Sequence, residues 1–128
     1  MTIYFVSGHL DLTEAEFVEH YIPKLNAAIA DEASFVVGDA RGCDALTQLW
    51  LAALNVPLTV FHMLDRPRNA FGFNVVLVGG FTTDAARDEV MTSRSDDDIA
   101  WVRPGRAKSG TAQNLARRAL KHHVVELE

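Results

Sequence analysis

An apolar run that stops at a glycine constrains the fold of this chain more than any other feature. Residues 35–37 are Phe, Val and Val, Gly38 and Gly42 follow, and apolar residues recur at helical spacing after Asp44. This pattern predicts a strand, a tight turn and the N-terminus of a helix. Backbone N–H groups and the positive end of the helix dipole then face outward, where they can bind an anion such as phosphate.

Strand-like and helix-like segments alternate along the first half of the chain. Apolar, β-rich runs at 3–6, 34–37 and 58–61 are separated by helical patterns, the first of which begins at a capping box formed by Thr13 and Glu16. Such alternation predicts βαβ units with right-handed crossovers. We therefore expect one α/β domain with a mainly parallel sheet of about five strands flanked by helices.

The rest of the chain predicts shorter elements. Pro23 interrupts the first helical pattern and is expected to kink that helix. Residues 74–78 suit a strand or a buried extended piece that ends at Gly79 and Gly80. Further expected elements are a loop at 62–74, an acidic and mostly exposed helix at 83–91, a turn at 95–98, a strand at 99–102, a basic loop at 103–110, a helix at 111–121 and a final edge strand at 124–127.

Composition and charge limit the classes of partner. With 48% hydrophobic and 23% charged residues, the chain is typical of a globular protein rather than a disordered one. The net charge of −5 argues against a general affinity for nucleic acid or anionic membranes. Cys43 is the single cysteine, so no intramolecular disulfide can form. We see neither a signal peptide nor an apolar stretch of roughly 20 residues, and expect a cytoplasmic protein with no membrane partner.

Three loops are expected to meet at one edge of the sheet. Residues 7–9, 38–44 and 103–111 each leave the carboxyl end of a predicted strand, which is where ligands bind in open α/β sheets. Because parallel strands end at the same edge, these loops form one composite site. The candidate binding residues are Ser7, Gly8, His9, Gly38, Asp39, Arg41, Gly42, Asp44, Arg103, Ser109, Gly110 and Thr111.

The turn at 38–44 has two interpretations. In the functional one, Gly38 and Gly42 let the backbone approach a ligand closely, and Arg41 pairs with a phosphate. Asp39 or Asp44 then accepts hydrogen bonds from ribose hydroxyls. In the alternative, the glycines only turn the chain from strand to helix and Asp44 only caps the helix.

The segment at 105–111 carries similar chemistry. Small hydroxyl residues flank Gly110, and Arg103, Arg106 and Lys108 supply positive charge, a combination that suits a phosphate. The alternative is an ordinary basic turn with Thr111 as the N-cap of the next helix. Together with the turn at 38–44, the segment favours a binding site.

At these segments the sequence resembles the SLOG superfamily, a Rossmann-like group that includes YpsA-like proteins, the DprA/Smf fold and LOG-type cytokinin-activating enzymes. The resemblance covers residues 7–9, 37–44, 91–96 and 109–111, and is greatest to small YpsA-type members whose loop is Gly-x-Ala-x-Gly-x-Asp. It implies a Rossmann-like three-layer α/β/α domain over residues 1–128. It also implies a nucleotide or nucleotide-derived ligand, with phosphate at the glycine loops, and a homo-oligomer.

The resemblance leaves two functions open. LOG-type phosphoribohydrolases carry a Pro-Gly-Gly-x-Gly-Thr-x-x-Glu motif whose Glu helps to cleave an N-glycosidic bond. Aligning residues 110–111 with its Gly-Thr puts Asn114 in the place of that Glu, which favours ligand binding, for example as a sensor, over hydrolysis. The alternative is an enzyme that cleaves or transfers at an N-glycosidic bond, either a nucleoside monophosphate phosphoribohydrolase or a deoxyribosyltransferase-like protein. Its candidate catalytic carboxylates are Asp39, Asp44 and Asp96.

Other residues that could carry chemistry give weaker indications of function. Consecutive acidic residues at 96–98 point in different directions and predict a solvated turn rather than a metal site. The pair at 122–123, both His, lacks ligand spacing and is expected at the surface. No metal or cofactor is therefore expected. A DNA-handling role, suggested by the DprA relatives, is disfavoured by the acidic charge and the lack of a basic, aromatic stripe.

A purely structural role is considered for His9, Cys43 and the two tryptophans. His9 can contact a base or phosphate, act as an acid or base, or serve the fold alone. Cys43, at the start of a helix, is expected to be a buried small residue because no partner that would activate it can be assigned. Trp50 and Trp101 lie in apolar patterns and are expected in the core.

Overall fold

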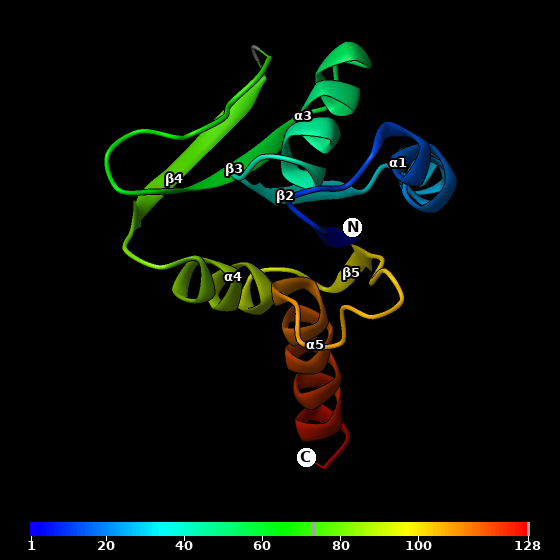
Figure 1. Ribbon diagram of the computed structural model, residues 1–128, viewed down its shortest axis with the longest axis vertical. Helices are drawn as coiled ribbons and strands as arrows, with labels where there is room; N and C mark the ends of the chain where they lie inside the picture. Colours follow the sequence, from blue (N-terminus) through cyan, green and yellow to red (C-terminus); the bar gives the residue numbers. More distant parts are fainter. Residues whose placement is uncertain (73, 128) are drawn as a thin grey trace.

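Five parallel strands form the middle layer of the protein (Figure 1). The computed structural model describes residues 1–72 and 74–127, and the surroundings of side chains up to residue 122. Every neighbouring pair of strands is parallel, which confirms the predicted α/β class and sheet. The strands are β1 (Ile3–Ser7), β2 (Ser34–Gly38), β3 (Leu58–Met63), β4 (Val75–Phe81) and β5 (Asp97–Ala100), in the order β4-β3-β2-β1-β5.

The order of the strands reverses beside β1. Strands β1 to β4 follow one another toward one edge of the sheet, whereas β5 pairs with the other side of β1, with Ser7 opposite Ala100. In open α/β sheets, a crevice suited to ligands lies at such a reversal, outside the carboxyl ends of the strands. The fold therefore directs attention to the loops that follow Ser7 and Ala100.

Helices cover both faces of the sheet (Figure 1). One face packs against α1 (Glu14–His20), α2 (Ile22–Ala30) and α3 (Cys43–Ala53), and the other against α4 (Asp84–Ser93) and α5 (Gly110–Leu127). Side chains alternate between the faces along each strand. Val6, Val37 and Val60 join the core under α1–α3, whereas Phe5, Val36 and Phe61 pack with Met91 of α4. This is the Rossmann-like three-layer arrangement.

The first helical region differs from its prediction at Pro23. The capping box of Thr13 and Glu16 is present, but the chain forms two helices that meet at Tyr21 instead of one kinked helix. Proline lacks the N–H that a helix interior needs and is accommodated in a first turn. Pro23 accordingly lies in the first turn of α2, and the break belongs before it.

Strand and helix ends in the second half also differ. Strand β5 is Asp97–Ala100, two residues earlier than predicted at its start and end, and β4 continues through Gly79 and Gly80 to Phe81. The ring of His62 occupies the space where a Cβ of Gly79 would lie. Glycine at this position therefore serves close packing within the sheet rather than the end of a strand.

The predictions for the last two helices have different outcomes. Helix α4 is capped by Thr83 and most of residues 83–91 are exposed as predicted, while Arg87, Met91 and Thr92 form its buried face. Helix α5 continues through residues 124–127, so the predicted final strand is wrong. Adding residues to an existing helix gains one hydrogen bond each, whereas β-branched residues favour a strand only beside a partner.

The connection between β3 and β4 has no helix over its described residues, 64–72 and 74. It is held by Gln48 of α3, whose amide donates to the carbonyl of Asn69 at 3.1 Å and accepts from the N–H of Phe71 at 3.0 Å. The predicted loop at 62–74 is therefore present, although its first two residues complete β3. None of the described helices is both long and apolar enough to cross a membrane.

Candidate ligand-binding site

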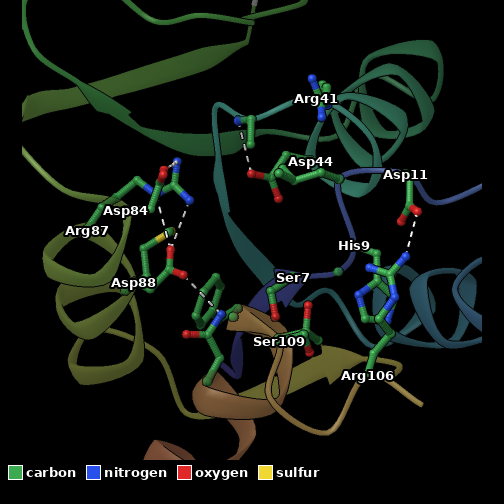
Figure 2. A pocket seen from close by; sticks show the side chains of 18 residues that line it. Ser7, His9, Asp11, Arg41, Asp44, Asp84, Arg87, Asp88, Arg106 and Ser109 are labelled. Atoms are coloured by element: carbon green, nitrogen blue, oxygen red, sulfur yellow. Dashed lines mark hydrogen bonds and ion pairs between the residues drawn. The ribbon is translucent and has the colours of Figure 1, made fainter. Parts of the chain in front are cut away.

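A cavity of about 490 Å³ opens at the carboxyl edge of the sheet (Figure 2). Four segments surround it: the end of β1 with its loop, the turn after β2, α4, and the start of α5. Its lining includes Ser7, Gly8, His9, Arg41, Asp44, Ser109, Gly110 and Thr111 of the predicted site, together with Phe5, Leu10, Asp11, Ala40, Asp84, Arg87, Asp88, Met91, Arg106 and Asn114. The predicted residues Gly38, Asp39, Gly42 and Arg103 lie outside this lining.

Asp39 is a structural anchor. Its fully buried carboxylate accepts from Arg68 at 2.8 Å and from Arg87 at 2.8 Å through Oδ1, and from the backbone N–H of Arg68 at 2.9 Å through Oδ2. Burial raises the pKa of Asp39, but the hydrogen bonds from Arg68 outweigh it and lower the pKa to about 2. Asp39 thus ties the loop after β3 and helix α4 to the end of β2.

The two glycines of the turn after β2 make room for the protein's own groups. A Cβ at Gly38 would contact the Asp44 carboxylate and would lie 2.8 Å from Cζ of Arg87. Gly42 has a φ of 73°, and a Cβ there would lie 2.5 Å from the carbonyl oxygen of His9. The close approach inferred from the sequence is therefore internal, as in the alternative interpretation of this turn.

The N-terminus of α3 is already occupied. The N–H of Cys43 donates to the carbonyl of His9 at 3.1 Å, and the carboxylate of Asp44 lies in the first turn of the helix. Oδ2 of Asp44 accepts the N–H of Ala40 at 3.1 Å. When ionised, this acidic side chain complements the helix dipole. The turn after β2 therefore presents an acid to the cavity instead of the expected anion cradle.

Asp44 has an unusual environment for a carboxylate. Burial raises its pKa to about 7, Arg87 acts in the opposite direction, and Asp88 and Asp39 raise it further. Asp44 lines the cavity and is mostly buried. At neutral pH both protonation states are populated, so the group can donate or accept a hydrogen bond.

The N-terminus of α5 is open toward the cavity. Ser109 caps the helix, since its Oγ accepts the N–H of Ala112 at 3.2 Å and its carbonyl accepts that of Gln113 at 3.0 Å. Thr111 is therefore not the cap. The first N–H groups of a helix have no partner within it, and Gly110 and Thr111, which carry them here, line the cavity.

A buried hydroxyl faces the same space. Ser7 is 5% exposed, lines the cavity and, within the described part of the chain, its Oγ has no hydrogen-bond partner. Ser109, from the start of α5, lines the same cavity (Figure 2). Buried polar groups are nearly always hydrogen-bonded, so an unpartnered one in a cavity indicates a place for a ligand atom or water.

Ion pairs of acidic and basic side chains lie on two sides of the cavity (Figure 2). Asp84, Arg87 and Asp88 lie on α4, where Arg87 pairs with Asp88 at 3.0 Å and with Asp84 at 3.3 Å. Arg106 and Asp11 pair on the other side at 2.8 Å. The sequence analysis did not predict that α4 lines the cavity. The spacing of residues 84, 87, 88 and 91, which places them on one helical face, could have indicated it.

His9 joins the loops around the cavity. Its Nε2 accepts the backbone N–H of Arg103 at 2.8 Å, which leaves the ring proton on Nδ1. Burial, and then the charge of Arg103, lowers the pKa of His9 and favours the neutral ring. Its carbonyl also accepts from Cys43, as described above. His9 therefore has a structural role while its side chain lines the cavity.

Asn114 and Arg103 have structural partners as well. Nδ2 of Asn114 donates to Asp88 at 3.2 Å, and Arg117 donates to its Oδ1. Arg103 lies outside the cavity lining and donates to Glu16 at 2.8 and 2.6 Å. Asn114 thus links α5 to α4, whereas Arg103 links the loop before α5 to α1.

Several other expectations concern residues away from the cavity. Asp96 accepts the N–H of Ile3 at 2.8 Å, at the opposite edge of the sheet, so it cannot serve as a catalytic carboxylate in this cavity. Asp98 is buried against Arg118, contrary to the predicted solvated turn. Cys43 is buried as expected, and burial raises the pKa of its thiol.

The predictions for the two tryptophans and for the histidine pair at 122–123 have different outcomes. Trp50 and Trp101 are only partly buried at the border of the core rather than within it. His122 is exposed, whereas the side chain of His123 lies outside the described residues. Among the described residues, no group of three or more His, Cys, Asp and Glu is arranged to hold a metal ion.

Comparisons with known proteins identify no relative. No family model, no curated protein and no solved structure matches the chain. The Rossmann-like fold and the geometry of the cavity therefore rest on the structure itself, and membership of the SLOG superfamily stays a prediction from the sequence motifs.

Proposed function

We propose that the protein binds a nucleotide or nucleotide-derived ligand in this cavity, with a phosphate at the N-terminus of α5. The observation that carries the proposal is the buried Oγ of Ser7, which has no partner among the described residues and lines the same cavity as the N-terminus of α5. Three kinds of donor are available there: this hydroxyl, the N–H groups of Gly110 and Thr111, and the guanidinium of Arg106. Such donors are what a phosphate requires.

The opposite wall suits the uncharged part of the ligand. Asp44, Asp84 and Asp88 supply carboxylate oxygens that accept hydrogen bonds from sugar hydroxyls. Like charges repel, so the same carboxylates disfavour a second or third phosphate. We therefore expect nucleoside monophosphates to bind more tightly than triphosphates. Binding without turnover corresponds to a sensor.

Thermal unfolding with a panel of nucleotides tests this proposal. A nucleoside monophosphate at about 100 times its Kd should raise Tm by roughly 10 °C, because a ligand that binds only the folded state stabilises it. Ser109→Ala should reduce that shift. Thr83→Ala is the matched control, since Thr83 caps α4 through the same kind of bond but lies outside the cavity lining. No shift with any nucleotide would overturn the proposal.

A second function is supported by the buried carboxyl of Asp44 in the cavity lining, where burial raises its pKa to about 7. A carboxyl group with such a pKa can act as a general acid at neutral pH. The enzymatic alternative, cleavage or transfer at an N-glycosidic bond, would then use Asp44, because Asp39 is held by two arginines and Asp96 lies at the other edge. Release of free base from a nucleoside monophosphate, abolished in Asp44→Asn, would support it. Stabilisation without release supports the binding function.

A further inference from the structure

Asp11 and Arg106 form an ion pair within the cavity lining. Nη2 of Arg106 donates to Oδ2 of Asp11 at 2.8 Å, and both residues line the cavity (Figure 2). The side chain of Arg106 is 45% exposed and that of Asp11 is 55% exposed, so the pair lies where the cavity meets solvent. Of the cationic side chains in the loop before α5, Arg106 is the one in the cavity lining, and it is engaged by a carboxylate of the protein itself.

Of the two arginines that contact Asp11, Arg106 is the one that can change its partner. Arg103 contacts Asp11 at 3.1 Å, but it also donates twice to Glu16 and lies outside the cavity lining. Among the described contacts of the Arg106 side chain, Asp11 is the one charged partner. Loss of Asp11 would therefore release Arg106, whereas Glu16 would still hold Arg103.

The backbone around Arg106 is already fixed. The N–H of Arg106 donates to the carbonyl of Arg103 at 3.0 Å, and the N–H of Ser109 donates to the carbonyl of Arg106 at 3.0 Å. A change of partner therefore requires rotation of the Arg106 side chain and no rearrangement of the loop. Such side-chain rotations are fast and need little energy at exposed positions.

We propose that Asp11 sets the affinity of the site for anions by holding Arg106 until a phosphate at the N-terminus of α5 replaces it. This inference rests on the proposed phosphate site and adds its regulation: Asp11 competes with the ligand for Arg106. It is a positioning residue, which acts through the guanidinium. Since exposed ion pairs are weak, the competition should reduce phosphate affinity by only ~2–5-fold.

A double-mutant cycle with inorganic phosphate as the probe tests this inference. Four proteins are compared by amide NMR titration: the wild type, Asp11→Asn, Arg106→Gln and the double variant. The shifts of Gly110 and Thr111 report binding. Asp11→Asn should bind phosphate ~2–5-fold more tightly, and Arg106→Gln more weakly. In the Arg106→Gln background, the gain from Asp11→Asn should shrink markedly. Asp31→Asn, an equal change of charge at the end of α2, should leave the affinity unchanged.

The outcomes separate this inference from the proposed function. If phosphate binds but Asp11→Asn gives no gain, or the same gain without Arg106, the competition is refuted and the phosphate site stands. If the amides of Gly110 and Thr111 shift in none of the proteins at any phosphate concentration, both proposals are overturned.

Discussion

The turn after β2 and the turn before α5 have similar sequences and opposite structures. Each contains glycine and an arginine and leads into a helix at the same edge of the sheet. At the first turn, the carbonyl of His9 accepts the N–H of Cys43, and the acidic side chain of Asp44 lies in the first turn of the helix. At the second, Ser109 caps the helix, and the two residues that follow line a cavity. A helix N-terminus can bind an external anion only where the protein's own acceptors leave it open.

The largest effect is expected at Asp39, the anchor of the closed turn. Asp39→Asn removes the charge that two arginines share, so the free energy of unfolding should fall by about 3–5 kcal/mol. Urea denaturation measures this loss, with Asp31→Asn as the control. Because the pKa of Asp39 is lowered to about 2, its contribution is present above about pH 4 and is lost as the pH falls toward 2. A variant that unfolds like the wild type but loses nucleotide binding would make Asp39 a ligand residue instead.

A slightly smaller effect, of opposite sign, is expected at Asp44. Its folded pKa of about 7 exceeds the unfolded value of about 4, so ionisation destabilises the fold as the pH rises from 4 to 7. Asp44→Asn should remove this loss and raise the free energy of unfolding by about 2–4 kcal/mol at pH 8, with little change near pH 4. Denaturation curves at both pH values measure it. A parallel pH dependence in wild type and variant would contradict the buried-acid interpretation.

Alanine substitutions at Gly42 and Gly110 compare how tightly the two turns are packed. Gly42→Ala forces a side chain into a φ of 73° and against the carbonyl of His9, and should cost about 1–3 kcal/mol. Gly110→Ala meets nothing within 4 Å and should change stability by less than about 0.5 kcal/mol. Thermal unfolding of the two variants gives the comparison. Equal losses would mean that the turn before α5 is as tightly packed as the turn after β2.

The smallest effect on stability is expected at Ser7. Its hydroxyl has no partner among the described residues, so Ser7→Ala should leave the free energy of unfolding within about 1 kcal/mol of the wild-type value, or raise it. The same change should reduce the thermal stabilisation by a nucleoside monophosphate. Differential scanning fluorimetry with and without ligand measures both. A large loss of stability without ligand would mean that the hydroxyl serves the fold.

Much of the fold was predictable because its signals are local. Apolar runs mark β1, β2 and β3, and the capping box of Thr13 and Glu16 marks the first helix. Errors arose where a distant partner decides the outcome. Gly79 stays in a strand because it packs against His62, and Arg87 of α4 is buried because it pairs with Asp39 at the end of β2.

The lining of the cavity was predicted in part for the same reason. The order of loops along a parallel sheet follows from alternating strands and helices, so residues 7–9 and 109–111 were correctly brought to one edge. The roles of Asp39 and Asp44 were not predictable. Both follow the same strand, and the difference between them comes from Arg68 and Arg87, which lie 29 and 48 residues from Asp39.

The sequence by itself determined that two glycine-bearing turns precede helices at one edge of a parallel sheet. Hydrophobic periodicity and capping residues act over a few positions, and they suffice for that conclusion. Only the tertiary structure decided which of the two helix N-termini is open. That choice depends on segments far apart in the chain: the carbonyl of His9 accepts the N–H of Cys43 at one turn, while the other lines a cavity shared with the Ser7 hydroxyl, which has no partner among the described residues.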